Sequence, residues 1–228
     1  MQRVIITNTL QADLLAAIND CEHDKTFVLT DTTTHQYCWP LIKDFPFLSD
    51  AHIIIIGATD VSKTLDSTAH VWEELQQGGA TRHSLLINLG GGMVTDLGGF
   101  AASTFKRGIN FINIPTTLLS MVDASVGGKT GINFGMLKNE IGVFNDSKYV
   151  LLCTDFLKTL DEPNIFSGYA EMLKHGLIST PKHWQELVAF DVTHPDMGQL
   201  ARMLATSVAV KEHIVDQDPH EHSIRKAL

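Results

Sequence analysis

The residues with the clearest chemical capacity lie between Asp123 and Asn139, a stretch that reads DASVGGKTGINFGMLKN. It combines paired glycines, Lys129 and Lys138, one acid and the amides Asn133 and Asn139. Glycine lets backbone N–H groups approach a ligand closely, and lysine supplies a point charge for phosphate. The stretch is too polar for a core strand and too rich in glycine for a helix. We therefore expect a loop that holds a phosphorylated, hydroxylated small molecule.

A nucleotide-triphosphate site is the first alternative, because Gly128-Lys129-Thr130 resembles the end of a phosphate-binding P-loop. That motif needs a glycine at position 123, which is Asp. It also needs a strand that leads into the loop, whereas residues 116–122 read as the start of a helix. The sequence therefore disfavours nucleotide hydrolysis.

A second candidate site is the run Gly90-Gly91-Gly92, which follows an apolar strand and opens a helix. Ligands of open α/β sheets bind at the carboxyl ends of strands, and free N–H groups at a helix start favour a pyrophosphate. The run is not the GxGxxG fingerprint, and a tight strand–helix turn explains it equally well. Asp96, in the first helical turn, would also stabilise the helix dipole.

Charged residues in the last third of the chain allow two readings each. Glu171, Lys174 and His175 share one helix face at i, i+3 and i+4 spacing, which suits either a metal ligand set or a surface ion pair. Lys211 and Arg225 flank an acidic segment. They could form a solvated network, or they could bind a substrate carboxylate or phosphate.

Composition narrows the class of protein. The 228 residues are 44% hydrophobic and 19% charged, as is usual for a globular protein. A net charge of -9 argues against bulk nucleic-acid binding. The three cysteines form no CxxC pair, which predicts reduced thiols and a cytoplasmic setting. The first residues form no apolar signal core, and the longest apolar run is too short to cross a membrane.

These sites need a scaffold, and the hydrophobic pattern predicts one. Strands are expected at 4–6, 27–29, 53–56, 85–89, 111–114 and 149–152, and helices at 10–18, 65–77 and 93–105. This alternation predicts a parallel-rich, Rossmann-like α/β domain over residues 1–152. Helices at 156–160, 164–177, 183–190 and 197–214 predict a helical domain over residues 153–228. Residues 223–228 open a further helix without a stop signal, so we expect that the chain is cut short and the helical domain only partly present.

Several motifs in the same order and spacing identify a resemblance. They are GGGMVTDLGGFAASTFKRG, INIPTTLLSMVDASVGGKTGIN, LKNEIGVF, TDFLKTL and GYAEMLKHG. Together they resemble the 3-dehydroquinate synthase family of the shikimate pathway, densely from Gly90 to Gly176 and again from Lys211 to Leu228. Several long motifs in register are far more specific than any one of them.

The resemblance implies a lyase that binds NAD in the α/β domain and a divalent metal, Zn²⁺ or Co²⁺, in the helical domain. Such enzymes convert 3-deoxy-D-arabino-heptulosonate 7-phosphate to 3-dehydroquinate and phosphate, a step toward chorismate and the aromatic amino acids. Hydride removal is followed by phosphate elimination, hydride return, ring opening and an intramolecular aldol closure.

The resemblance also assigns residues. The NAD phosphates and ribose would lie at Gly91, Gly92, Met93 and Asp96, and the nicotinamide side at Thr116, Thr117, Phe156 and Thr159. Asp60 and Lys63 would contact NAD, and Asp31 would hold the adenosine ribose. The substrate residues would be Asp123, Lys129, Lys138, Asn139, Lys174, Lys211 and Arg225, with Glu171 as a metal ligand. Arg107 would reach a neighbouring subunit's site, which implies a homodimer.

The chain departs from the family pattern at a few positions. Thr95 and Ser223 stand where glycine is usual, so a positive φ at Ser223 would strain a turn. Thr33 stands where Asn is common, and Asp60 replaces a glutamate that is one methylene longer. The family's other two metal ligands come after residue 228. Because one carboxylate holds zinc poorly, the resemblance implies that residues 1–228 alone are catalytically silent.

Three alternatives remain. One is another sugar-phosphate cyclase, acting on a substrate without a carboxylate, although Lys211 with Arg225 favours a substrate that has one. A second is a polyol or alcohol dehydrogenase of the same fold. The third is a non-catalytic NAD-binding or dimerisation module.

Overall fold

Six short strands rich in β-branched and leucine side chains form one sheet, in the order β1-β8-β5-β4-β2-β3. The computed structural model describes residues 2–228. The strands, in this order, are Arg3–Ile6, Tyr149–Leu152, Asn110–Pro115, Leu85–Gly90, Thr26–Asp31 and His52–Ile56. Every neighbouring pair runs parallel, so all the carboxyl ends meet at one edge. The predicted parallel α/β fold is confirmed.

Helices cover both faces of this sheet, which explains why the strands read as continuous apolar runs. Alternate residues of β4 enter different cores: Leu85 and Ile87 join a cluster with α1 (Leu10–Asp20), and Leu86 joins a cluster with α3 (Leu65–Gln77) and α4 (Gly92–Thr104). The short α2 (Thr32–Tyr37) begins directly after β2. Helix α3 has the bounds that its apolar periodicity predicted, and Gly78 follows as its C-cap.

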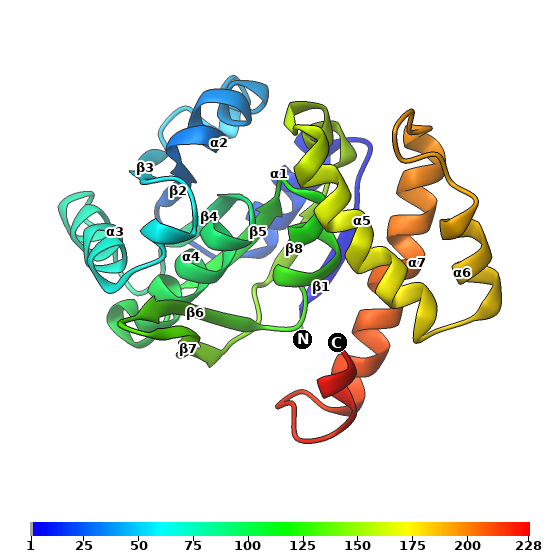
Figure 1. Ribbon diagram of the computed structural model, residues 1–228. Helices are drawn as coiled ribbons and strands as arrows, with labels where there is room; N and C mark the ends of the chain where they lie inside the picture. Colours follow the sequence, from blue (N-terminus) through cyan, green and yellow to red (C-terminus); the bar gives the residue numbers. More distant parts are fainter. Residues whose placement is uncertain (1) are drawn as a thin grey trace.

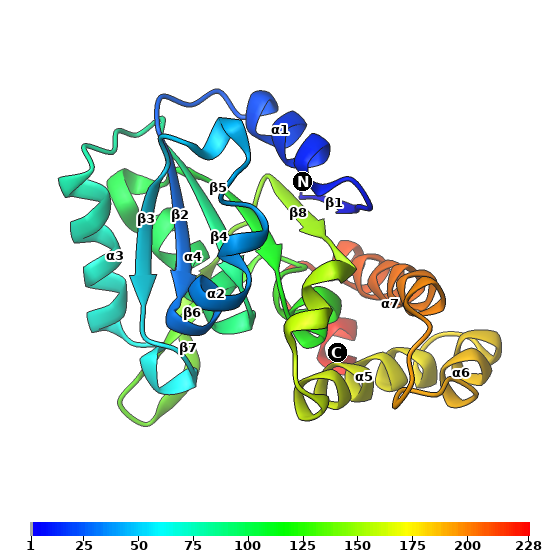
Figure 2. The same ribbon diagram turned by 90° about the horizontal axis from the view of Figure 1, so that it is seen from above.

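Three further helices lie together beside the sheet (Figures 1 and 2). They are α5 (Glu162–Leu177), α6 (Pro181–Val188) and α7 (Met197–Gln217). Each begins with a side-chain cap, from Asp161, Thr180 and Asp196 respectively. Apolar residues of α5 and α7 belong to the same core cluster as the strands, so this helical part packs directly on the α/β part. The helices predicted at 156–160 and 223–228 are instead short 3₁₀ helices, Thr154–Thr159 and Ile224–Ala227.

The loop predicted between Asp123 and Asn139 is wrong for most of its length. Asp123 lies in a π-helical turn, Ser120–Ala124, and the rest enters an antiparallel hairpin of β6 (Lys129–Phe134) and β7 (Leu137–Phe144). All eight residues of β7 are exposed, so the hairpin needs no apolar alternation. Gly131 faces Gly142 across the two strands, and a Cβ on Gly142 would stand 1.9 Å from the Thr130 carbonyl oxygen. The glycines therefore permit close strand pairing rather than an irregular loop.

Within residues 2–228, no helix combines the length and the apolar character that a membrane span requires.

Gly168 lets α5 approach the backbone that leads into the π-helical turn. A Cβ at this position would stand 2.4 Å from the Leu119 nitrogen and 2.6 Å from the Leu118 carbonyl carbon. We expect Gly168→Ala to lower the free energy of unfolding by about 1–3 kcal/mol, because backbone atoms must shift. Denaturant unfolding measures the change. The matched control is Gly198→Ala, at an exposed position of α7, which should be neutral or stabilising by up to about 1 kcal/mol. Equal effects at both positions would contradict this packing argument.

Candidate active site

A charged cavity of 290 Å³ lies where the carboxyl-end edge of the sheet meets the hairpin and the helical part. It brings together seven residues that the sequence predicted for the site, from six separate segments. They are Lys63, Asp96, Asp123, Lys129, Asn139, Lys211 and Arg225. Four of these side chains are basic and two are acidic, so the walls are cationic although the chain as a whole is acidic. Such a cavity suits a ligand that carries negative charge.

Lys63 links the cofactor side of this cavity to the hairpin. Its ammonium donates to Asp96 Oδ2 and to Asn139 Oδ1, both at 2.6 Å, and only 3% of Lys63 is exposed. Asn139 has a left-handed backbone (φ +60°), and its N–H donates to the side chain of Asn133. Burial raises the pKa of Asp96 to about 6, although Lys63 opposes this shift. Asp96 can therefore hold or release a proton near neutral pH.

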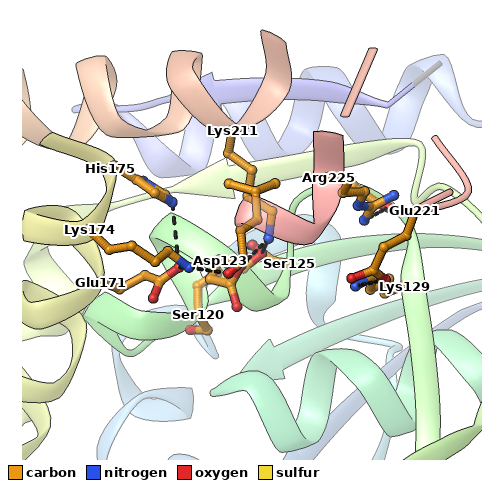
Figure 3. A network of polar contacts seen from close by, with 12 residues as sticks. Ser120, Asp123, Ser125, Lys129, Glu171, Lys174, His175, Lys211, Glu221 and Arg225 are labelled. Carbon is orange, nitrogen blue, oxygen red and sulfur yellow. Dashed lines mark hydrogen bonds and ion pairs between the residues drawn. The ribbon is translucent and has the colours of Figure 1, made fainter. Parts of the chain in front are cut away.

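Lys211 joins the helical part to the π-helical turn (Figure 3). From the middle of α7 its ammonium donates to the Asp123 carbonyl oxygen at 2.6 Å and forms an ion pair with the Asp123 carboxylate. Lys211 is 5% exposed. Burial lowers the pKa of its ammonium, and Asp123 counters that effect. Asp123 thus holds Lys211 as a buried cation at the cavity wall.

Arg225 is the most deeply buried cation of the cavity, with 1% of the residue exposed. Its guanidinium donates to the carbonyl oxygens of Gly127 (2.7 Å) and Pro219, and it stacks over the Phe144 ring. Among residues 2–228, no carboxylate lies within 4.0 Å of it. Burial lowers the pKa of this guanidinium, whose charge is countered only by more distant acids. A bound anion would supply the missing counter-charge.

Glu171, Lys174 and His175 share one face of α5, as predicted (Figure 3). The Glu171 carboxylate pairs with Lys174, and its Oε1 lies 3.5 Å from His175 Nε2. Burial opposes ionisation of Glu171, but the nearby His175 and Lys174 outweigh it and lower its pKa. Within the described residues, no three His, Cys, Asp or Glu side chains lie close enough to hold a metal ion. Glu171 offers one oxygen ligand, and these residues do not complete a metal site by themselves.

The start of α4 forms a glycine cradle. Gly91 is the N-cap and provides no side-chain cap, so backbone N–H groups of the first turn stay open to a ligand. A Cβ on Gly92 would stand 3.0 Å from Ala124 Cβ, and one on Gly91 would stand 3.2 Å from Thr117 Cγ2. The cradle therefore has room for backbone only. This arrangement fits a pyrophosphate at a helix N-terminus.

Other predicted cofactor residues surround the same edge of the sheet. Thr116 follows β5, with its N–H donating to the Gly90 carbonyl oxygen. Asp31 ends β2 and caps α2 by accepting from the Thr34 N–H at 2.7 Å. Thr95 fits the helix without strain, since its hydroxyl donates to the Gly92 carbonyl oxygen. The glycine usual at that position is therefore not required here.

Phe156 and Thr159 line a different cavity, which has a volume of 800 Å³ and mainly apolar walls. It lies between the start of α1, the segment with Leu41 and Phe45, and the 3₁₀ helix after β8. Thr159 also contacts Cys38, at the end of α2, through its hydroxyl. This cavity shares no lining residue with the charged one.

Three predicted substrate residues do not line the charged cavity. Lys138 pairs with Asp60 at 3.1 Å, with 71% of its side chain exposed. Lys174 donates to the Leu228 carbonyl oxygen as well as to Glu171. Arg107 is exposed, with a left-handed backbone (φ +69°), in the 3₁₀ helix Phe105–Arg107.

Sequence reasoning missed Glu221, which pairs with Lys129, and Asp218, which organises the segment before Arg225. An aspartate at a helix end followed by proline was the available signal for Asp218. The strain expected at Ser223 is absent, because its φ is −143°.

Comparison with known proteins decides the family. The family model described as 3-dehydroquinate synthase N-terminal matches residues 53–167, and the one described as 3-dehydroquinate synthase C-terminal matches residues 168–228. This chain belongs to the 3-dehydroquinate synthase family. The resemblance inferred from the motifs is therefore confirmed.

Curated members of the 3-dehydroquinate synthase family match the whole chain. The 3-dehydroquinate synthase of Parabacteroides distasonis is 51% identical over 227 residues, and that of Pyrococcus furiosus is 39% identical over 216 residues. These matches cover 100% and 95% of this chain, but 64% and 63% of the relatives. The chain thus spans slightly less than two thirds of the length of these relatives.

A solved structure shares the architecture of this chain. The 2-epi-5-epi-valiolone synthase of Streptomyces hygroscopicus subsp. jinggangensis, with NAD⁺ and Zn²⁺ bound, is 27% identical and superposes with a TM-score of 0.86. The match covers 98% of this chain and 63% of that one.

The partly buried carboxyl of Asp96 makes stability depend on pH. Its folded pKa of about 6 exceeds the ordinary 3.8, so the folded chain binds more protons than the unfolded chain between these values. The unfolding free energy therefore falls as pH rises from about 4 to 7. We expect Asp96→Asn to remove this pH dependence. The difference in unfolding free energy between the variant and the parent should therefore change by about 3 kcal/mol between pH 4 and pH 7. Denaturant titrations at several pH values test it. The exposed Asp44→Asn serves as the control, and a parallel pH profile for parent and Asp96→Asn would contradict the assignment.

Proposed function

We propose that the protein is a 3-dehydroquinate synthase, which converts 3-deoxy-D-arabino-heptulosonate 7-phosphate to 3-dehydroquinate and phosphate. The observation that carries this proposal is the charged cavity, in which Arg225 is buried and no acid of residues 2–228 lies within 4.0 Å of its guanidinium. The substrate has two anionic groups, a carboxylate and a phosphate. Lys129, Lys211 and Arg225 supply several cations at one end of the cavity to meet them.

NAD fits the glycine cradle. The pyrophosphate would rest on the N-terminus of α4 at Gly91, Gly92 and Met93, and Asp31 would accept from the adenosine ribose. Because Phe156 and Thr159 line the apolar cavity, this cavity suits the adenine base better than the nicotinamide. The nicotinamide would then lie toward Asp96 and Thr117, near the charged cavity. When bound, NAD supplies the transient hydride acceptor.

The metal role rests on Glu171. The related valiolone synthase holds Zn²⁺, and Glu171 would supply one ligand in this protein. The described residues do not complete a metal ligand set.

The side chains of the cavity can perform the remaining tasks. Buried Lys211 and Arg225 would neutralise the substrate's anions, because charges act strongly where water is excluded. Asp123 orients Lys211, and Lys63 joins Asp96 to Asn139 so that the cofactor side and the substrate side share one network. Asp96, with a pKa of about 6, can accept a proton as hydride leaves the substrate carbon.

The second candidate function is that of another sugar-phosphate cyclase, since a valiolone synthase shares this architecture at 27% identity. A substrate without a carboxylate would leave the buried Arg225 without a counter-ion. The dehydroquinate synthase reading is therefore favoured.

Turnover distinguishes these functions. In a full-length protein that supplies the remaining metal ligands, with NAD⁺ and a divalent metal, we expect phosphate release from 3-deoxy-D-arabino-heptulosonate 7-phosphate, with NAD⁺ recycled, and none from glucose 6-phosphate. Residues 1–228 alone should release phosphate from neither, because the residues that the structure describes do not complete a metal site. Arg225→Lys keeps the charge but loses the planar donor fork, so kcat/KM should fall by about tenfold or more. Arg202→Lys, at an exposed position of α7, is the control and should leave kcat/KM unchanged. Release from glucose 6-phosphate alone would favour the second candidate.

A homodimer is the most suitable assembly for this chain. The hairpin exposes a group of apolar side chains, including Phe134, Leu137 and Met136, the last of which is 99% exposed. Arg107 lies outside the charged cavity of its own chain, which agrees with a role in a neighbouring subunit's site.

Three buried, unpaired cysteines agree with a reducing cytoplasmic setting.

Association through the hairpin can be tested by charge. We expect Phe134→Asp combined with Met136→Asp to convert the dimer to monomers, because buried unpaired carboxylates oppose contact. Light scattering on a size-exclusion column reports the mass. Val188→Asp, at an exposed apolar position of α6, should remain dimeric. A dimer that survives both hairpin changes would place the interface elsewhere.

A further inference from the structure

The segment that carries Arg225 is shaped by the residue that ends α7. Asp218 is the C-cap of this helix, and its N–H donates to the carbonyl oxygens of Ile214 and Val215. Its position is therefore fixed by the same helix that carries Lys211. From there the chain makes a tight reversal through Pro219 and Glu221, the latter with a left-handed backbone (φ +59°).

The Asp218 carboxylate gathers the backbone of this reversal. It accepts hydrogen bonds from the backbone N–H groups of His222 at 2.8 Å, Ser223 at 2.7 Å and Arg225 at 3.1 Å. It also accepts one from the Ser223 hydroxyl at 3.3 Å. Asp218 is 5% exposed, and among residues 2–228 no lysine or arginine side chain pairs with it within 4.0 Å. Three backbone N–H groups and one hydroxyl thus compensate a buried charge. Burial opposes its ionisation, but these bonds prevail and hold the pKa of Asp218 at about 2.

These hydrogen bonds fix the backbone of Arg225. With its N–H bound to Asp218, its side chain runs back along the segment to the Pro219 and Gly127 carbonyl oxygens. In the part of the chain that the structure describes, no acid pairs directly with this guanidinium. Its place in the cavity wall therefore depends on the backbone from which it starts. The same reversal brings Glu221 to Lys129 (Figure 3).

We propose that Asp218 is a positioning residue, which folds residues 218–225 so that the Arg225 guanidinium faces the charged cavity ready for a substrate anion. This role rests on the proposed function, in which Arg225 binds that anion. Asp218 itself does not line the cavity, so it acts through Arg225 alone.

The direct test observes Arg225 without any substrate. In nitrogen-resolved NMR spectra, assigned with Arg225→Lys, a guanidinium held by two carbonyl oxygens should give resolved, slowly exchanging Nη–H signals. Asp218→Ala should abolish these signals, and Asp218→Asn, which keeps one oxygen acceptor, should weaken them. Asp216→Asn removes a carboxylate at an exposed position two residues earlier and should leave them intact. Unchanged Arg225 signals in Asp218→Ala would overturn the proposal.

Kinetics then separates positioning from a general loss of structure. Asp218→Asn should raise the KM for 3-deoxy-D-arabino-heptulosonate 7-phosphate by about tenfold, while the Kd for NAD⁺, measured by calorimetry, stays unchanged. In an Arg225→Lys background, the same change should alter KM by less than about twofold, because the two residues act as one unit. Additive effects, or an equal loss of NAD⁺ affinity, would indicate a purely structural role and refute positioning. These kinetic measurements use a full-length protein with a complete metal site. If that protein shows no turnover, the proposed function fails, and the NMR test still decides the role of Asp218.

Discussion

Lys211 reaches from α7 to Asp123, and this ion pair, in which the lysine is buried, joins the helical part to the carboxyl-end edge of the sheet. A buried ammonium is costly unless it is paired and hydrogen-bonded, so the two parts must meet with Asp123 in one place. That requirement fixes the rotation and register of α7. The same helix ends at Asp218, so the position of Arg225 follows from the docking that satisfies Lys211.

The charge of the cavity wall is opposite in sign to the net charge of the chain. The formal net charge is -9, yet four basic and two acidic side chains line the cavity. The acids are engaged with lysines, Asp96 with Lys63 and Asp123 with Lys211, which leaves Arg225 without a close acid among the described residues. Internal pairing keeps the lysines in place before a ligand arrives. The guanidinium without a close acid then attracts an anion into the cavity, and this favours the proposed substrate, which carries a carboxylate.

Local pattern was sufficient where burial is regular along an element. The strand Tyr149–Leu152 is a continuous buried run, and the helix Leu65–Gln77 buries one face at helical spacing, so both were predicted with the bounds that they have. The hairpin was missed because its exposed β7 follows no such pattern, and its glycines serve strand pairing. Family motifs supplied seven residues of the cavity. The contact of Glu221 with Lys129 joins segments far apart in the chain, so no local spacing could reveal it.

Helix α4 ties the cofactor cradle to the charged cavity. Its N-terminus forms the cradle, and Asp96, about one turn later, lies in the cavity wall. Two adjacent glycines hold it on both sides: a Cβ on Gly98 would stand 2.0 Å from Asn88 Oδ1 in the sheet, and one on Gly99 would stand 2.6 Å from Thr130 Cγ2 in the hairpin. The helix therefore packs closely between β4 and β6. Because close-packed elements cannot shift independently, the cradle and the cationic wall keep a fixed separation, as the proposed hydride transfer between two bound molecules would require.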